Sequence, residues 1–583
     1  MSAEKLITDH IDIWTSAVQA KSSSGRGSGK KRELYGIKKL RELILELAVR
    51  GKLVPQDPSD EPACELLNHE EITQRGLLKL GKGKILDLNR RISENEKRFV
   101  LPCGWEWTRL GKTIEVTGGS QPPKSKFVYE HREGYVRLVQ IRDFKSDTNL
   151  TYVPQEFANR PFVETDIMIG RYGPPVFQIL RGLSGTYNVA LMKAELVGDS
   201  IHNDYLFWLL SEPFIQKLVT SESERTAGQS GVRKELIYDF VIALPPKQEQ
   251  HRIVAKIDEL MALCDQLEQQ TEASLGAHQV LVETLLATLT NSQDATELMA
   301  NWARISEHFD TLFTTEQSID QLKQTILQLA VMGKLVSQDP NDEPAAKLLE
   351  RIAEEKAQLV KEKKIKKQKA LPPIAEDEKP FELPNGWEWC RFEDVVEIHS
   401  GITKGRKLAG RELKTIPYLS VANVQRGYLN LQNVKEIDLP VDELEKYAVE
   451  AGDLLITEGG DWDKVGRTAI WRTEAPYMAH QNHVFKARPY LSEQSEIWLG
   501  MYLNGPFARD YFAGSSKQTT NLASINKTQL RSCLIAVPPN GEKQRITMKV
   551  QELMDMCKLL QERIAVCQQT QFQFADAIVL NAL

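Results

Sequence analysis

Apolar positions follow a helical spacing in two stretches of this chain, one beginning near residue 250 and one near residue 545. Steps of four and three residues alternate, which places apolar side chains on one helix face and is typical of a coiled-coil seam of about three heptads. A Pro-Pro pair precedes each stretch, and proline suits a helix start because its φ is fixed. An ordinary helical core would show the same spacing over one such run. The predicted seam residues are Ile253, Ile257, Leu260, Cys264, Leu267, Ile546, Val550, Leu553, Cys557, Leu560 and Ile564.

The chain also repeats itself over long distances. Three segments recur in order: residues 40–67 match 322–349 at 19 of 28 positions, 101–107 (LPCGWEW) match 383–389 (LPNGWEW), and 240–264 match 533–557. A separation near 290 residues indicates a duplicated domain pair, because solenoid repeats are far shorter. The repeated ILELAVRGKLV and ILQLAVMGKLV predict a second amphipathic helix, ended by Gly51 and Gly333. The QDP-x-DEPA stretch that follows predicts a turn before another helix.

Two inserts, residues 108–238 and 390–531, separate the repeated blocks and share little sequence. Both contain short β-like runs, among them YVRLVQI (135–141), IPYLSVANV (416–424) and DLLIT (453–457). Gly, Pro, Asn and Asp punctuate these runs, which indicates mixed α/β domains with functional loops. Similar blocks imply one mechanical role performed twice, and dissimilar inserts imply two different targets. The helix between them, expected from about 248 to 289, would be on the order of 60 Å long and would act as a spacer.

Composition adds limits to this organisation. The 583 residues are 41% hydrophobic and 26% charged, which fits several globular domains. The net charge of −6 gives no overall signature of nucleic-acid binding, and residues 101–246 hold 16 Lys and Arg against 17 Asp and Glu, while 383–539 hold 18 against 19. DNA binding would therefore need cations gathered on one face, or phosphate contacts supplied by a partner.

The seven cysteines are scattered without a CxxC pair, which predicts reduced thiols and no zinc site. Neither a signal peptide nor an apolar run of about 18 to 20 residues is present in the sequence. We therefore expect a soluble, cytoplasmic protein without a bound metal or cofactor of its own.

Polar loops in the inserts supply candidate DNA contacts. VTGGSQPPKSKF and IHSGITKGRK combine glycine with cations and suit a phosphate backbone. Residues 224–236 and 515–530 hold side chains that can pair with base edges. Surface loops of any soluble protein contain such residues as well. The candidates are Lys124, Lys126, Arg137, Arg142, Arg171, Gln229, Arg233, Lys404, Arg406, Lys407, Arg426, Lys517 and Asn521.

Two further basic segments have simpler interpretations. Residues 351–370 hold eight Lys and Arg against three Glu, which fits a solvated helix face or, less simply, a contact with phosphate or a partner. Residues 22–32 (SSSGRGSGKKR) fail the spacing of a phosphate-binding P-loop and predict a flexible basic linker.

Enzyme classes are poorly supported. The PP pairs lack the preceding Asn or Asp and the following aromatic residue of an adenine methyltransferase, and no P-loop for a helicase or ATPase is present in the sequence. Neither insert concentrates the carboxylates and lysine of a nuclease. We expect a non-catalytic protein.

The ordering of LAVRGKLVPQDPSDEPA, LPCGWEW, a variable insert and LPPKQEQHRIVAKIDEL, followed by a second such set, resembles the specificity subunit of Type I restriction-modification systems over residues 33–583. The resemblance implies an α+β fold in which two mixed α/β target recognition domains are joined by long antiparallel coiled-coil helices, with a pseudo-two-fold internal repeat. The implied domains are a helical block (1–100), a first recognition domain (101–246), a central helical spacer (247–382), a second recognition domain (383–539) and a C-terminal coiled-coil helix (540–583).

The resemblance also implies partners and a function. Each recognition domain would read one half of a split, asymmetric site on double-stranded DNA. The helices would separate the two halves and dock two modification subunits, which use S-adenosylmethionine to methylate adenine. Restriction subunits with ATP and Mg²⁺ would join them. Near-neutral inserts leave an alternative open, a two-armed protein-interaction scaffold without DNA readout.

The chain departs from the family pattern at one helix start. Gly541, Glu542 and Lys543 stand where the family has a Glu-Gln pair, which the first copy keeps as Glu249 and Gln250. We expect this change to alter the start of the second long helix. Because recognition domains differ between family members, no base-contacting residue can be carried over by motif.

Overall fold

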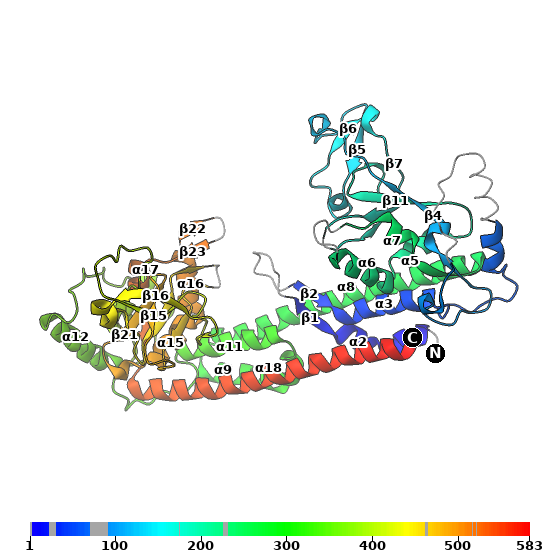
Figure 1. The fold of residues 1–583 in the computed structure, drawn as a ribbon. Helices are drawn as coiled ribbons and strands as arrows, with labels where there is room; N and C mark the ends of the chain where they lie inside the picture. Colours follow the sequence, from blue (N-terminus) through cyan, green and yellow to red (C-terminus); the bar gives the residue numbers. More distant parts are fainter. Residues whose placement is uncertain are drawn as a thin grey trace. The chain divides into compact units, whose positions relative to one another are not determined.

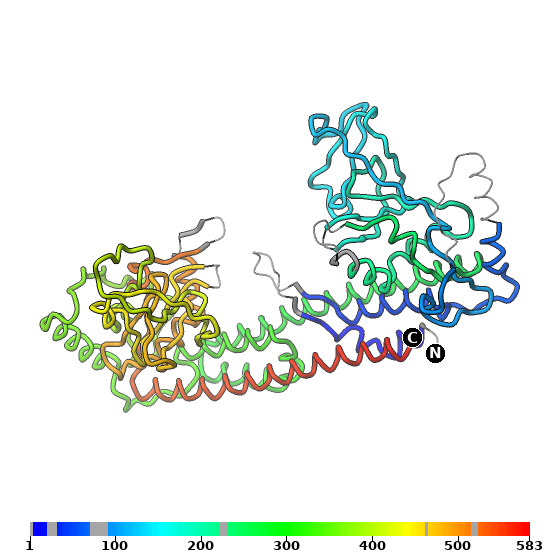
Figure 2. The backbone as a smooth tube through the Cα atoms, in the orientation of Figure 1, coloured from blue at the N-terminus to red at the C-terminus, as the bar shows by residue number. Residues whose placement is uncertain are grey.

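The computed structural model describes residues 3–21, 31–69, 91–173, 175–225, 231–460, 464–515, 517–519 and 522–583. The chain forms two compact units. The first contains residues 1–274 and 567–583, and the second contains residues 275–566. The first unit is therefore discontinuous in sequence, and both chain ends lie within it (Figure 2).

The first unit begins with a small helical layer. A two-stranded antiparallel hairpin pairs Val18 with Leu34 and leads directly into an amphipathic helix whose apolar face is buried. The elements are α1 (Ala3–Thr8), α2 (Ile11–Ser16), β1 (Val18–Lys21), β2 (Lys31–Leu34) and α3 (Tyr35–Val49). Of the predicted basic linker 22–32, residues 22–30 lie outside the described residues, and Lys31 and Arg32 lie in β2.

Next in the first unit comes a mixed α/β domain built from three sheets. The strand orders are β12-β3, β4-β11-β8-β9 and β6-β5-β10-β7, and β5 and β10 run parallel. The strands are β3 (Glu106–Arg109), β4 (Ile114–Gly118), β5 (Tyr135–Val139), β6 (Tyr152–Pro154), β7 (Pro161–Phe162), β8 (Ile167–Gly170), β9 (Ile179–Leu180), β10 (Gly185–Tyr187), β11 (Leu191–Leu196) and β12 (Val241–Leu244).

Three helices follow β11 in this domain, and two of them contact the helical layer. They are α5 (Asn203–Leu210), α6 (Pro213–Arg225) and α7 (Lys234–Tyr238), and α5 and α6 contact α3. In Figure 1 these helices lie between the sheets and the long helix α8 (Lys247–Asn291).

The second unit repeats the same plan. Its helical layer packs against α15 and α16, as α3 packs against α5 and α6. The helices are α9 (Ala295–Glu307), α10 (Phe309–Leu312), α11 (Glu316–Val331), α12 (Ala345–Lys361), α13 (Phe392–Val395), α14 (Leu444–Tyr447), α15 (Glu496–Asn504), α16 (Pro506–Ser515), α17 (Lys527–Ser532) and α18 (Asn540–Ala582). The strands are β13 (Glu388–Arg391), β14 (Val396–His399), β15 (Leu413–Leu419), β16 (Lys435–Pro440), β17 (Leu454–Thr457), β18 (Gly459–Gly460), β19 (Thr468–Ile470), β20 (Ala479–His480), β21 (Val484–Pro489), β22 (Lys517–Thr519), β23 (Leu522–Ser524) and β24 (Leu534–Val537).

The two inserts share a topology although their sequences differ. The order β14-β21-β17-β19 corresponds to β4-β11-β8-β9, and β16-β15-β20 corresponds to β6-β5-β10. The parallel pairing of β5 with β10 recurs between β15 and β20, and β13 pairs with β24 as β3 pairs with β12. The second domain adds a small sheet of the order β18-β23-β22. The predicted α+β fold with a duplicated mixed α/β module is confirmed.

The two long helices match the sequence prediction closely. The first was expected from about 248 to 289 and spans Lys247–Asn291. Eight of the predicted seam residues are buried, and Leu553, Leu560 and Ile564 pack half-buried against the core of the second unit. That core also contains Ile319 of α11, so the first half of α18 packs beside α11. Coiled-coil pairing of α8 with α18 stays a prediction.

The ends of the long helices meet the repeated GKLV segments. Lys334 donates from Nζ to the carbonyl oxygens of Thr290 and Ser292, at 2.9 and 3.0 Å, at the end of α8. Lys52, its counterpart in the first copy, donates to the carbonyl oxygen of Leu583 at 2.6 Å, just past α18. Cations suit these positions because the last carbonyls of a helix are unpaired and carry partial negative charge. The repeated lysine therefore holds the end of a long helix in each unit.

Other local predictions have mixed outcomes. Gly51 and Gly333 follow α3 and α11 with φ of 65° and 68°, as predicted for glycine after a helix end. The basic stretch 351–370 is only partly helical, because α12 ends at Lys361 and the remaining lysines lie on an exposed segment. All seven cysteines are free thiols. None of the described helices is long and apolar enough to cross a membrane.

Candidate nucleic-acid interface

A buried joint attaches each α/β domain to its long helix. In the first unit, Trp105 of the WEW segment donates from Nε1 to a carboxylate oxygen of Glu249 at 2.9 Å. In the second, Trp387 donates to Glu542 at 3.0 Å. Both carboxylates are almost fully buried in the first turn of a helix, and burial raises the pKa of each, against the opposing effect of the indole hydrogen bond.

Ion pairs and close glycine contacts complete the joint. Arg252 of α8 pairs with Asp60 of the QDP-x-DEPA turn at 2.5 Å, and Arg545 pairs with Asp342 in the same way at 2.7 Å. A Cβ on Gly51 would lie 2.5 Å from Cγ of Pro102, so only glycine fits there. The three repeated sequence blocks therefore meet at one place, which explains why they repeat together.

The departure at Lys543 does not alter the helix start. α18 begins at Asn540, which is the counterpart of Lys247 at the start of α8, and Glu542 makes the tryptophan contact of Glu249. The prediction of an altered helix start is therefore wrong. The reason is that Lys543 fits the buried place of the first copy's glutamine and donates to the carbonyl oxygen of Glu493 at 3.0 Å. Burial lowers the pKa of Lys543 to about 8.

The sequence comparison missed one matched pair in the joint. Buried Arg109, at the end of β3, pairs with Glu96 at 2.8 Å, and Arg391 pairs with Glu378 at 3.0 Å. Hydrogen bonds from Ser93 and Arg109 lower the pKa of Glu96 to about 2. The signal was available in the sequence, since ENEK before LPCGWEW recurs as EDEK before LPNGWEW.

Four segments meet at one place in the first α/β domain, which we call the first junction. The Arg171 backbone, just after β8, donates to the carbonyl of Ala190 at 2.8 Å and accepts from Val232 at 3.1 Å. The loop after β4 joins them where Ser120 donates to the Tyr187 carbonyl. Three of the four segments, the β4 loop, the residues after β8 and the residues before α7, hold predicted DNA contacts.

The same hydrogen bonds recur in the second domain and define the second junction. Glu458, just after β17, donates to the carbonyl of His483 at 3.0 Å and accepts from Ile525 at 2.9 Å. Ile402 of the loop after β14 donates to the His480 carbonyl at 2.8 Å. The two junctions therefore superpose residue for residue in their backbone bonding while their side chains differ.

A glycine makes each junction possible. A Cβ on Gly119 would lie 1.9 Å from the carbonyl oxygen of Asn188, and one on Gly401 would lie 2.3 Å from that of His480. The glycines in the predicted DNA-contacting loops are thus required for the close approach of two backbones. The structure gives them this role whether or not a phosphate approaches.

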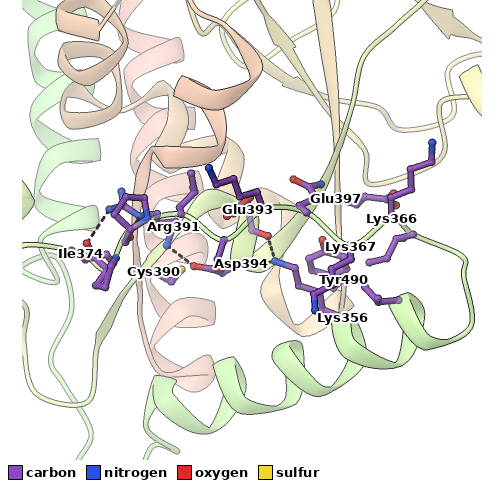
Figure 3. A pocket seen from close by; sticks show the side chains of 18 of the residues that line it. Lys356, Lys366, Lys367, Ile374, Cys390, Arg391, Glu393, Asp394, Glu397 and Tyr490 are labelled. Carbon is purple, nitrogen blue, oxygen red and sulfur yellow. Dashed lines mark hydrogen bonds and ion pairs between the residues drawn. The ribbon is translucent and has the colours of Figure 1, made fainter.

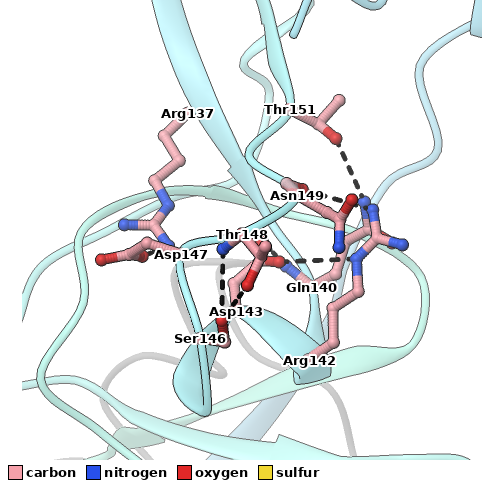
Figure 4. A network of polar contacts seen from close by, with 9 residues as sticks. All are labelled: Arg137, Gln140, Arg142, Asp143, Ser146, Asp147, Thr148, Asn149 and Thr151. Atoms are coloured by element: carbon pink, nitrogen blue, oxygen red, sulfur yellow. Dashed lines mark hydrogen bonds and ion pairs between the residues drawn. The ribbon is translucent and has the colours of Figure 1, made fainter.

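The predicted cations of the first domain fall into two groups. Lys124, Lys126 and Arg233 are exposed, and Arg171 is half-buried at the first junction. Arg137 and Arg142 belong instead to the polar network of the β5–β6 loop (Figure 4). Gln229 lies outside the described residues.

Figure 4 shows how that loop uses its arginines. Arg137 pairs with Asp147 at 2.7 Å, and Arg142 donates to the carbonyl of Asn149 at 3.4 Å. The Arg142 side chain is still 55% exposed, whereas that of Arg137 is 20% exposed. Arg142 also lies 3.6 Å from a carboxylate oxygen of Asp143, so both arginines help to order the loop, and Arg142 is the more exposed of the two.

In the second domain the loop after β14 holds three predicted cations. Lys404 and Lys407 are exposed, and Lys404 lies 5.0 Å from the ring centre of Tyr418. Arg406 is half-buried and pairs with Glu443 at 2.8 Å. The loop thus offers two lysines to solvent and uses its arginine for its own structure.

The remaining predictions lie on other segments of that domain. Arg426 is half-buried and donates to Asn504 Oδ1 at 3.5 Å. Lys517 begins β22, and Asn521 lies outside the described residues. A DNA-contacting role for these residues, as for the others, stays a prediction.

A cavity of about 450 Å³ lies in the second unit between the end of α12 and β13 (Figure 3). Lys356 reaches into it and donates to the carbonyl oxygen of Glu393 at 2.8 Å, with a carboxylate oxygen of Asp394 3.8 Å away. Arg391 holds the opposite wall by donating to the Pro372 carbonyl at 3.1 Å. Lys356 and Arg391 are thus already bound by the walls of the cavity, and we assign the cavity no ligand. Within the described ranges, His, Cys, Asp and Glu form no cluster able to hold a metal.

The fold and the joints define a class of protein with two copies of one α/β module. Each copy is attached to a long helix, and the two copies carry different side chains at the junction. The family model of the Type I restriction modification DNA specificity domain matches residues 102–277 and 384–568. The chain therefore belongs to the family of Type I restriction-modification specificity subunits.

Named relatives agree over the full length. The chain is 42% identical to the Type I restriction enzyme EcoEI specificity subunit and 43% identical to the EcoAI specificity subunit, both of Escherichia coli, with 100% of each chain covered. A solved structure concerning complex assembly and conformational transition of the type I R-M system is 18% identical, with a TM-score of 0.49, over 83% of this chain and 99% of that one.

Proposed function

We propose that this chain reads a bipartite, asymmetric site on double-stranded DNA, one half with residues 101–246 and the other with residues 383–539. The contrast between the two junctions carries the proposal: their backbone hydrogen bonds are the same and their side chains differ. The same backbone arrangement with different side chains suits two domains that recognise different DNA sequences. Base edges change along the duplex, whereas phosphates do not.

The helical blocks 1–100, 247–382 and 540–583 would set the distance between the two readers and dock two modification subunits. The buried seams and the fastening joints support this role, since both make the long helices stiff attachments of the recognition domains. Pairing of the long helices in an antiparallel coiled coil would add to that stiffness.

Catalysis would belong to the partners. The modification subunits would carry S-adenosylmethionine and methylate adenine, and restriction subunits would use ATP and Mg²⁺. This chain would contribute sequence choice without a cofactor of its own, and the assembly would act in the cytoplasm. The relatives support the division of labour, because both are named as specificity subunits of a restriction enzyme.

Mapping of N6-methyladenine across the genome tests the proposal. Cells with the chain and its modification subunits should show a split methylated motif that disappears when the gene for the chain is deleted. Exchange of residues 108–238 for the corresponding insert of a relative should change one half of the motif and leave the other. A change of both halves together would contradict the assignment of one domain to one half.

The balanced charge of both inserts keeps a protein-interaction scaffold as the second candidate. A mobility-shift assay at low salt, with the chain bound to its modification subunit, separates the two, because low salt favours any phosphate contact. Absence of DNA binding under these conditions would favour the scaffold.

A further inference from the structure

The side chains at the two junctions have opposite charges at one matched position. Arg171 and Glu458 make equivalent backbone hydrogen bonds, each directly after the corresponding strand, β8 or β17. The residues that follow them also contact matched positions. In the first junction the ring of Tyr172 packs on Gly231, and a Cβ on Gly231 would lie 2.6 Å from that ring. In the second junction Gly459 pairs with Ser524.

The Arg171 side chain is restricted by a neighbouring ring and has no carboxylate partner among the described residues. Its guanidinium centre lies 5.1 Å from the Tyr172 ring centre, which restricts the side chain. Its Nε is buried without a hydrogen-bond partner, as is that of Arg137, but among the described residues no ion pair joins Arg171 to a carboxylate. Arg137 and Arg181 of the same domain, in contrast, each pair with an aspartate at 2.7 Å.

Glu458 is held in a comparable way. One carboxylate oxygen lies 2.5 Å from Nδ1 of His483, and the Glu458 side chain is 29% exposed. His483 is more open, at 55%. The histidine fixes one oxygen and leaves the other as an acceptor.

The exchange of charge at this position favours contact with a base edge over contact with a phosphate. Phosphates carry the same negative charge along any DNA, so a phosphate-contacting position should keep a cation in both copies. Base edges differ between two half-sites, and a reversal from donor to acceptor is what a change of base demands. Arginine pairs with O6 and N7 of guanine, and a carboxylate accepts from the N4 amino group of cytosine.

We propose that Arg171 and Glu458 are matched specificity-determining residues: Arg171 reads a guanine in one half-site, and Glu458 reads a cytosine in the other. The inference rests on the proposed function, since it assigns bases to the two readers. It concerns one position of each half-site.

The test uses the complete complex with its modification subunits and compares the methylated motif of variants with that of the wild type. Arg171→Gln should change the preferred base from guanine to adenine at one position of one half-site, because glutamine pairs with N6 and N7 of adenine. Glu458→Gln should weaken discrimination for cytosine in the other half-site by about 10- to 100-fold in competition binding. Arg132→Gln, at an exposed arginine of the same domain that is not among the predicted DNA contacts, is the matched control and should leave the motif unchanged.

An unchanged motif in both variants would overturn the inference. So would a uniform loss of affinity of Arg171→Gln for all sequences, together with a smaller salt dependence of binding, because that result would make Arg171 a phosphate contact. If Arg171→Gln abolishes methylation altogether, the nearly isosteric Glu458→Gln decides the question in its own half-site. Failure of the proposed function itself is distinct, because the wild-type complex would then yield no split motif.

Discussion

Single residues explain why parts of the sequence repeat. Glu249 and Glu542 are buried carboxylates that accept a hydrogen bond from a tryptophan some 150 positions away, and this contact joins the WEW segment to the long helix in each unit. Desolvation makes the ionised form of each carboxylate costly. Burial of these two carboxylates therefore makes the stability of the joint depend on pH.

Glu249→Gln tests this cost. Burial raises the folded-state pKa of Glu249, so its favourable contribution is present below the unfolded pKa and is lost as pH rises through the folded value. Glutamine has no charge to lose. The free energy of unfolding of the variant, from urea titrations at pH 4 to 8, should therefore improve relative to the wild type as pH rises.

Glu272→Gln is the matched control for that titration, because Glu272 is exposed on the same helix. Its difference from the wild type should stay nearly constant over the same range. Parallel curves for Glu249→Gln and the wild type would mean that ionisation of Glu249 is not penalised by burial.

Residue chemistry was only partly readable from the sequence. A search for cations selected Arg171, which the structure places at a junction, but also Arg137 and Arg406, which are paired internally. It passed over Glu458, because a carboxylate is not an obvious DNA contact. Only the matched backbone bonding reveals that Arg171 and Glu458 occupy one position.

At the scale of elements, the ends of α3 and α11 are the places in the repeat where the structure requires one residue type, glycine. Gly51 and Gly333 each end a helix at positive φ, and each lies against a proline and a tryptophan of the joint. Alanine at either position would meet both the backbone penalty of this conformation, roughly 1–2 kcal/mol, and a Cβ contact of 2.5 or 2.6 Å. We expect Gly51→Ala and Gly333→Ala each to lower the free energy of unfolding by at least about 1–2 kcal/mol in urea titrations.

Gly276, within α8, supplies the opposite case. No atom lies within 4 Å of a Cβ built there, and the position is helical. Gly276→Ala should raise stability by roughly 0.5–1 kcal/mol, since alanine is the better helix former. Destabilisation by all three alanines would indicate that space and backbone conformation do not account for the two repeated glycines.

Elements differed in how well the sequence predicted them. The ends of α8 were predicted to within two residues, because the heptad spacing of its apolar positions persists over many turns. The common topology of the inserts was not predicted. Their strands are as short as two residues, and the offset between matched positions grows from 282 at Gly119 to 287 at Arg171 and 293 at Ala190. Unequal loops thus hide the correspondence from any alignment at a fixed offset.

At the scale of the whole molecule, the first unit is assembled from two distant parts of the chain. Residues 567–583 supply Asp576, which accepts a hydrogen bond from Tyr35 at 2.8 Å, and Phe572, whose ring centre lies 5.0 Å from that of Tyr35. Lys52 holds the last carbonyl of the same segment. The end of α18 is thus part of the structure around α3.

Deletion of residues 567–583 should loosen α3 selectively. We expect faster amide hydrogen exchange across residues 35–49, because the helix loses packing and hydrogen bonds on one side. Exchange in α11, whose contacts lie within residues 275–566, should stay close to that of the wild type. Tyr35→Phe, which removes only the bond to Asp576, should give a smaller effect, and equal loosening of both helices would contradict this arrangement.

The discontinuity of the first unit has a consequence for protein synthesis. A ribosome makes residues 1–274 early, yet residues 567–583 are made only after the whole second unit. During elongation α3 lacks one of its neighbours until residues 567–583 are made, and a premature stop before this segment harms the unit that was made first. Late translation errors would thus impair one reader and leave the other well folded.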